Sequence, residues 1–192
     1  MDESTYRFLV RTALALTVIF VAVSIYDCGI KDTQPGDFAY QEADNFFEDG
    51  RYDKSLEKYN EALTADSANI NALRGKARSL MQLKRFNEAL KSYDLAVTLE
   101  PGYAATYANR GILHDRMRHY QKALADYDKA LELDPKINEG PHWLTRFMRN
   151  QPEKPPGVTD RANYLREQLT KPENERLLRV PELDSKQRSY KQ

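Results

Sequence analysis

Cysteine is almost absent from this chain of 192 residues. The single cysteine, Cys28, excludes an intramolecular disulfide and any metal site built from several cysteines. The sequence also contains no Asn-X-Ser/Thr acceptor for N-glycosylation. We therefore expect packing and hydrogen bonds, rather than covalent or metal cross-links, to hold the fold together.

An excess of charge of either sign is also absent, since 29 Lys and Arg balance 29 Asp and Glu. Proteins that bind nucleic acid usually carry a strong basic excess, because they must neutralise phosphates. The balance gives no support to a nucleic-acid partner, and we predict none.

Catalytic signatures are missing as well. The chain contains no HExxH, GxSxG, P-loop or GxGxxG sequence. His114 and His119 are five positions apart, which does not place them on one helix face as metal ligands. We predict a protein that is not an enzyme, with no cofactor, no metal and no small-molecule substrate.

One long apolar run stands near the N-terminus. Residues 12–26 carry no charge, and a helix over residues 8–26 would be about 28 Å long, close to the ~30 Å hydrocarbon core of a membrane. Arg7 and Arg11 lie on its N-terminal side. By the positive-inside rule, the run predicts a single-pass anchor with a cytoplasmic N-terminus and the remainder on the periplasmic side of a bacterial-type envelope.

Two other interpretations of residues 1–30 stay open. The uncharged part is short enough for a cleaved signal peptide, with small residues at Ala22 and Ser24 before a cut. Cys28 after the apolar run also resembles a lipidation site, although Asp27 stands where lipoproteins have a small residue. Either reading predicts a periplasmic protein or a lipoprotein after processing.

The central part of the chain repeats with a period of 34 residues, marked by small and aromatic positions. The repeating columns are Ala43, Ala77 and Gly111; Tyr52, Phe86 and Tyr120; Ser55, Ala89 and Ala123; Tyr59, Tyr93 and Tyr127; and Ala62, Ala96 and Ala130. Pro101 and Pro135 close the second and third copies, and Ser67 takes that place in the first.

This period and these columns resemble the tetratricopeptide repeat (TPR) family, with repeats over 36–69, 70–103 and 104–137. The resemblance implies an all-α solenoid of paired antiparallel helices, in which small residues allow close helix crossings and tyrosines fill the gaps. The third copy predicts helices over about 105–118 and 121–133. The first copy departs from the pattern at Ser55 and Ser67, and we expect a less sharply defined first junction.

The C-terminal third begins with a predicted capping helix over 138–150, where Trp143, Leu144, Phe147 and Met148 form an apolar stripe. A basic, proline-containing extension follows over 151–192, with a short helix predicted over 159–170. The extension either folds back onto the array or forms a docking arm.

In tetratricopeptide arrays the first helix of each repeat lines a concave, ligand-binding face. The resemblance therefore implies a protein or peptide partner on that face. Arg74 and Arg78 are one turn apart and would suit an acidic peptide. The candidate binding residues are Tyr40, Asp44, Phe47, Arg74, Arg78, Met81, Asn109, Ile112 and Arg116.

One subfamily is disfavoured by its own binding residues. TPR co-chaperones hold the carboxylates at the C-terminus of heat-shock proteins with a clamp of Lys, Asn and Arg. Tyr40, Asp44, Gly75, Ala105 and Asn109 stand in five of those places here. The clamp is absent, and Asp44 would repel a carboxylate.

The sequence thus favours a non-catalytic, membrane-anchored scaffold or assembly factor of bacterial type that binds a partner through its concave face. Two alternatives remain. One is an accessory subunit of a membrane complex, held by its anchor helix. The other is a processed or lipidated structural factor of the cell envelope.

Overall fold

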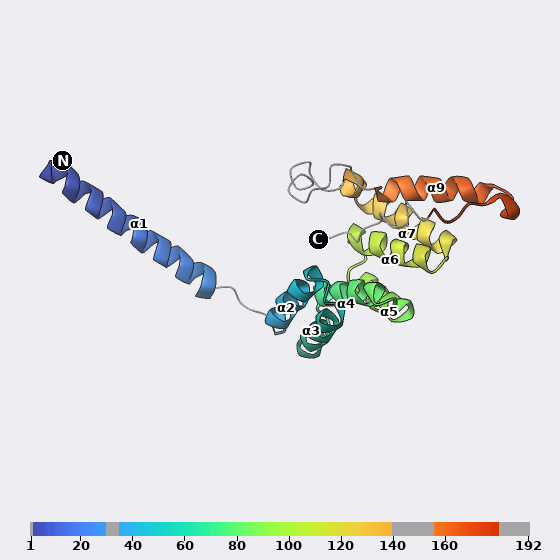
Figure 1. Ribbon diagram of the computed structural model, residues 1–192, viewed down its shortest axis with the longest axis horizontal. Helices are drawn as coiled ribbons and strands as arrows, with labels where there is room; N and C mark the ends of the chain where they lie inside the picture. The colour runs from blue at the N-terminus through green and yellow to red at the C-terminus, as the bar shows by residue number, and fades with distance from the viewer. Residues whose placement is uncertain (1, 30–34, 140–155, 181–192) are drawn as a thin grey trace. The chain divides into compact units, whose positions relative to one another are not determined.

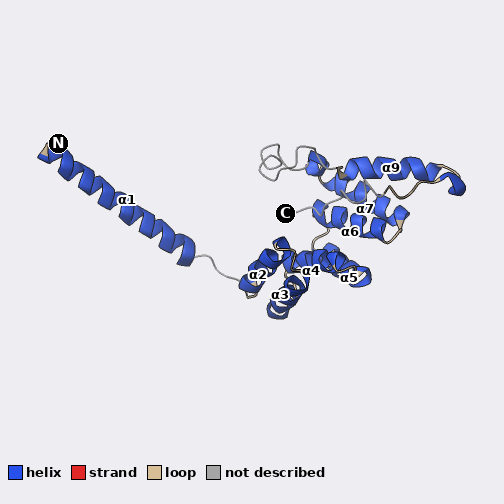
Figure 2. Ribbon diagram, in the orientation of Figure 1, coloured by secondary structure: helices blue, strands red, loops and turns tan. Residues whose placement is uncertain are grey.

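The computed structural model describes residues 2–29, 35–139 and 156–180. The chain divides into two units, Met1–Gln34 and Pro35–Gln192 (Figure 1). Over the described residues the structure consists of eight α-helices and two short 3-10 helices, and it contains no strand (Figure 2). The predicted all-α architecture is confirmed.

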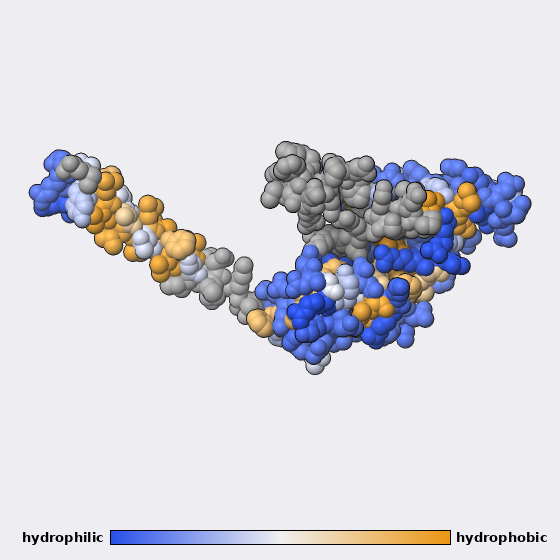
Figure 3. Space-filling model, in the orientation of Figure 1, coloured by the Kyte–Doolittle hydropathy of each residue, from blue (hydrophilic) through white to orange (hydrophobic). Residues whose placement is uncertain are grey.

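The first unit is one helix, α1 (Glu3–Gly29). Its stretch Glu3–Ser24 has the length and apolar composition of a membrane span, and a signal sequence meets the same criteria. None of this stretch is buried, and large side chains such as Phe20, 72% exposed, cover its surface (Figure 3). The hydroxyl groups of Thr17 and Ser24 donate to the carbonyls of Ala13 and Phe20, which lowers the penalty for placing them in an apolar medium. The Cys28 side chain lies outside the described residues, so its lipidation stays a prediction.

The second unit opens with six helices that form consecutive antiparallel hairpins (Figure 1). Each hairpin lies within one predicted repeat range. The helices are α2 (Asp37–Glu48), α3 (Tyr52–Ala65), α4 (Ile70–Gln82), α5 (Phe86–Leu99), α6 (Ala104–Arg116) and α7 (Tyr120–Leu133).

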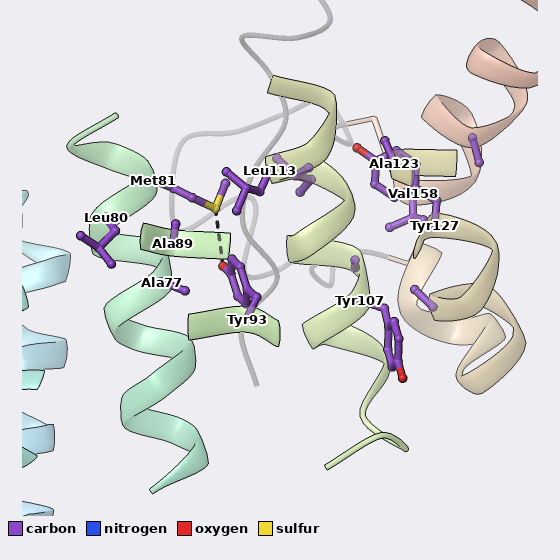
Figure 4. Packing of buried hydrophobic residues seen from close by; sticks show 14 of the residues in the cluster. Ala77, Leu80, Met81, Ala89, Tyr93, Tyr107, Leu113, Ala123, Tyr127 and Val158 are labelled. Carbon is purple, nitrogen blue, oxygen red and sulfur yellow. Dashed lines mark hydrogen bonds between the residues drawn. The ribbon is translucent and has the colours of Figure 1, made fainter. Parts of the chain in front are cut away.

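The helices of the hairpins contact one another at the repeating small residues and tyrosines. Tyr59, Tyr93 and Tyr127 are each 0% exposed. The small residues on either side of them in the columns are also 0% exposed: Ser55, Ala89 and Ala123 before them, and Ala62, Ala96 and Ala130 after them. The third-repeat tyrosine lies against Gly111, where an added Cβ would come within 2.7 Å of the Tyr127 ring. An equivalent close approach joins neighbouring repeats, because a Cβ on Gly75 would lie 2.2 Å from Cζ of Tyr59. Figure 4 shows Tyr93, Tyr107 and Tyr127 among the residues of this core.

The turn inside each hairpin requires a left-handed backbone. Gly50 has φ 73°, and the residues 34 and 68 positions later, Lys84 and Arg118, have φ of 60° and 64°. Glycine adopts this conformation without steric penalty, whereas a side chain is disfavoured there. The second and third turns therefore hold a strained residue where the first holds a glycine.

Side-chain hydrogen bonds lie at both places where the first repeat departs from the family pattern. The buried Ser55 hydroxyl pairs with that of Ser79 in the next repeat at 2.9 Å. At the junction without proline, the Asp66 carboxylate accepts from the Ala68 amide at 3.0 Å, and Asn69 caps α4 by accepting from Ala72. The same turn occurs at the third junction beside Pro135, where the Asp134 carboxylate accepts from the Lys136 amide at 2.9 Å. The expectation of a less sharply defined first junction stays a prediction.

The C-terminal part continues the solenoid. A 3-10 helix, η1 (Pro135–Glu139), follows α7, and residues 140–150 of the predicted capping helix lie outside the described residues. Helix α9 (Val158–Thr170) packs against α7 and adds Val158, Ala162 and Leu165 to the main core cluster. It is followed by a short 3-10 helix, η2 (Glu173–Glu175). Of the two readings of the extension, the described part folds back onto the array.

A buried ion pair fastens α9 to the third repeat. The Arg161 guanidinium donates to both carboxylate oxygens of Asp115, at 2.6 and 2.8 Å, and to the carbonyl of Leu178 at 3.0 Å. Both charged side chains are 5% exposed. A bidentate pair of this kind fixes position as well as charge, so it sets the place of α9 on α6.

We predict that Gly75→Ala destabilises the array. Its Cβ would overlap the Tyr59 ring, and overpacking of a dense core costs about 1–3 kcal/mol, more than the ~1 kcal/mol of helix propensity that alanine gains. Thermal unfolding followed by circular dichroism measures the change. Gly102→Ala is the matched control, because nothing lies within 4 Å of its Cβ position, and an equal loss in both variants would contradict the packing argument.

We also predict that Arg161→Met weakens the docking of α9. The substitution leaves the Asp115 carboxylate buried without its cation, at a cost of about 3–5 kcal/mol. Denaturant unfolding and protease cleavage within 158–170 report the loss. The double variant Asp115→Leu, Arg161→Met removes both charges and should regain most of the stability, whereas no recovery would show that the pair does not act through charge.

Candidate functional site

The nine candidate binding residues all lie on the first helices of the hairpins. Three belong to α2, three to α4 and three to α6. The structure brings the α2 and α4 residues into direct contact through Asp44 and Arg78. These helices provide the surface that the resemblance assigned to ligand binding, and the binding role itself stays a prediction.

A polar and aromatic cluster joins α2 to α4 around Asp44. Arg78 Nη2 lies 3.1 Å from Asp44 Oδ1, and the Tyr59 hydroxyl donates to the same oxygen. The Arg78 guanidinium also lies 4.9 Å from the centre of the Phe47 ring. Burial, followed by the negative charge of Asp44, raises the pKa of Tyr40. The cluster is therefore internally paired, with Tyr40 and Phe47 at its half-buried edge.

A second cluster surrounds Arg74 where α4 meets the start of α6. Its Nε donates to the Thr106 hydroxyl at 2.8 Å, and its Nη2 forms an ion pair with Glu100. The guanidinium stacks 3.8 Å from the centre of the Tyr103 ring. Because Thr106, Glu100 and Tyr103 all contact this one side chain, Arg74 connects the second repeat to the third.

The remaining candidates differ in exposure. Met81 and Ile112 are 1% and 3% exposed and belong to the main core cluster, where the Met81 sulfur accepts from Tyr93. Asn109 is also buried, and Arg116, the last residue of α6, is exposed. Of the predicted apolar contacts, Phe47 keeps part of its side chain accessible.

Sequence reasoning missed the partners of the buried cations. Glu100 and Tyr103 lie at the junction of two repeats, and Arg161 lies 46 residues after Asp115. The column pattern offers no signal for such contacts, since they join non-equivalent positions. The available clue was the position of Glu100 at the end of the second repeat, because the junctions of stacked repeats lie close to the neighbouring first helices.

A separate pocket between α5, α6 and α7 is lined by Leu90, His114 and Lys122 among others. Within it, Arg110 donates to both carboxylate oxygens of Asp126 at 2.7 and 2.8 Å and to Asp94 at 2.9 Å. Burial lowers the pKa of His114, so the imidazole is neutral near pH 7. The described residues contain no group of three or more His, Cys, Asp or Glu that could hold a metal.

Two family models for the tetratricopeptide repeat match the chain, one over residues 40–104 and one over residues 104–137. Together they cover 40–137, just over half of the 192 residues. A comparison with curated proteins found no match.

Solved structures of TPR domains have a similar fold. The first TPR of Spaghetti (RPAP3), bound to the HSP90 peptide SRMEEVD, is 24% identical with a TM-score of 0.60, over 74% of this chain and 100% of that one. The first TPR domain of human RPAP3 is 23% identical with a TM-score of 0.60, over 74% and 98%. The TPR2B domain of yeast Sti1, from a pHsp70 complex, is 18% identical with a TM-score of 0.53, over 62% and 94%.

Three observations indicate the same family: the helices are paired, the small and tyrosine columns are buried, and two models of the family match the sequence. TPR domains are typically non-catalytic modules that bind other proteins. This chain belongs to the tetratricopeptide repeat family.

Proposed function

We propose that this protein is a membrane-anchored interaction scaffold or assembly factor of a bacterial-type envelope, which holds a protein or peptide partner on the face formed by α2, α4 and α6. The observation that carries the proposal is the array itself, whose first helices hold all nine candidate residues. Tyr40, Asp44 and Phe47 are partly accessible, and Arg116 is exposed. No catalytic role is part of the proposal.

Structures of similar fold support a peptide ligand. The two TPR domains of Spaghetti and the Sti1 domain have been determined with heat-shock protein peptides or in a heat-shock protein complex. This chain lacks the clamp residues of such co-chaperones, with Asp44 and Gly75 at two of those places. We therefore propose the same mode of binding with a different peptide chemistry.

The apolar surface of α1 supports the anchor. An exposed helix with Leu16 and Val18 each 66% exposed is unstable in water, and insertion into a bilayer removes this surface from solvent. Arg7 and Arg11 on its N-terminal side favour a cytoplasmic N-terminus, which would put the array in the periplasm.

If residues 1–30 form a retained membrane anchor, the mature protein keeps its full length. Extracted from the membranes of its own host, the chain should have its full-length mass, and protease added to spheroplasts should cleave the array while an N-terminal tag stays protected. A mass that lacks residues 1–27, with an acylated Cys28 at the new N-terminus, would overturn the anchor in favour of a lipoprotein. Loss of the apolar run without acylation would favour a cleaved signal peptide.

The binding face predicts site-specific cross-links. A photo-reactive phenylalanine analogue at Glu48 or Arg116, both exposed, should form adducts with a partner in the host membrane. The same analogue at the exposed Glu57 of α3 is the matched control, because α3 is the second helix of its hairpin. Adducts at Glu57 alone, or at none of the three positions, would contradict binding through the first helices.

A further inference from the structure

We propose that the partner segment is basic, carrying Lys or Arg side chains that bind the carboxylates of Asp44 and Glu100. This inference rests on the proposed function, since it names the chemistry of the peptide that the face of α2 and α4 would hold. It departs from the expectation, drawn from the sequence, that Arg74 and Arg78 meet an acidic ligand.

Helix α4 forms two ion pairs, one with Asp44 of α2 and one with Glu100, which follows α5, and in both the acid is more exposed than the arginine. In the pair between α2 and α4, the Arg78 side chain is 10% exposed and that of Asp44 is 40% exposed. In the pair at the next junction, Arg74 is 8% exposed and Glu100 is 45% exposed. Each pair thus buries its cation and presents its anion to solvent.

The arginines have little capacity left for a ligand. The planar guanidinium of Arg78 lies over Phe47 and that of Arg74 over Tyr103, so one face of each group is covered by a ring. Arg74 also donates to Thr106 and Asn71. An acidic peptide would have to displace Glu100 or Asp44 from these partners, which leaves a desolvated carboxylate without its cation.

The carboxylates have the opposite character. A basic side chain can approach their exposed oxygens without breaking the internal pair, because a carboxylate has about four lone-pair sites and accepts from several donors at once. The half-buried rings of Tyr40 and Phe47 lie on the same helix as Asp44 and offer contact for the aliphatic stem of Lys or Arg.

The wider charge of the first repeat acts in the same direction. Helix α2 contains Asp37, Glu42, Asp44 and Glu48 and no Lys or Arg. Over residues 36–69 there are nine acidic and three basic residues, a net charge of −6, whereas residues 70–103 have six basic and three acidic residues, a net charge of +3. The negative field is therefore strongest around α2. A field of this sign attracts cationic peptides and repels anionic ones before contact.

The test is a selection of peptides by the full chain in detergent micelles from an immobilised library of random sequence. We expect the wild-type protein to enrich peptides rich in Lys and Arg, and the enrichment to weaken at high salt. In the variant Asp44→Asn, Glu100→Gln the amide oxygens still accept from Tyr59, Arg78 and Arg74, but both negative charges are gone. This variant should bind the enriched peptides about tenfold more weakly.

Two further variants keep the test decisive. Glu57→Gln, Glu132→Gln removes the same charge from the exposed surface of α3 and α7, and it should bind as the wild type does. If the first variant proves unstable, Glu48→Lys takes its place in the test. This variant puts a positive charge on an exposed residue of α2, and it should weaken the binding of basic peptides.

The outcomes separate the two proposals. Enrichment of acidic peptides would overturn the basic partner and leave peptide binding intact. Basic peptides that bind the variant Asp44→Asn, Glu100→Gln as tightly as the wild type would overturn the site. Enrichment of no peptide would overturn both the basic partner and peptide binding by this face.

Discussion

The close approach of helices at small residues is the constraint on which this structure depends. A tyrosine ring fills the interior of each hairpin, and it fits because alanine or glycine faces it on the helices around it. At Gly75 and Gly111 even a methyl group would overlap the neighbouring ring. Since interiors are packed to crystal-like density, the positions of the first helices follow from these contacts. The position of the proposed binding face therefore follows from packing contacts in the core.

Charged residues serve the stacking of repeats as much as the surface. Arg74, Arg78, Arg110 and Arg161 each pair with an acid outside their own helix, and Arg74 and Arg78 also lie over an aromatic ring outside their own helix. Arginine suits this role because its planar group forms directed hydrogen bonds and stacks on rings. The consequence for the surface is that carboxylates, rather than guanidinium groups, face solvent at the first two junctions. This arrangement is the basis for proposing a basic partner.

The end of the solenoid shows how a repeat array closes. The third repeat is the last that the 34-residue pattern predicts, and its apolar surface needs a cover. Helix α9 supplies Val158, Ala162 and Leu165 to the core and is fixed by Arg161. Asp115 accepts this cation on α6, so the extension also modifies the face on which a partner is proposed to bind.

The sequence by itself determined the fold class, the hairpins and most of the core. Its 34-residue columns repeat because every hairpin solves the same packing problem, so Tyr59, Tyr93 and Tyr127 are identical in type and equally buried. The apolar run of α1 is equally readable, because hydropathy is a local property. The candidate site was predictable only as a set of positions on the first helices. Tertiary structure decided which of them are accessible, since Met81 and Ile112 are core residues and Arg74 and Arg78 are paired. It also decided the place of α9, through Asp115 and Arg161. The contacts of Arg74 and Arg161 join non-equivalent positions, about which periodicity carries no information. Asp44 and Arg78 are equivalent positions 34 residues apart, but their residue types differ, so no repeating column marks the pair.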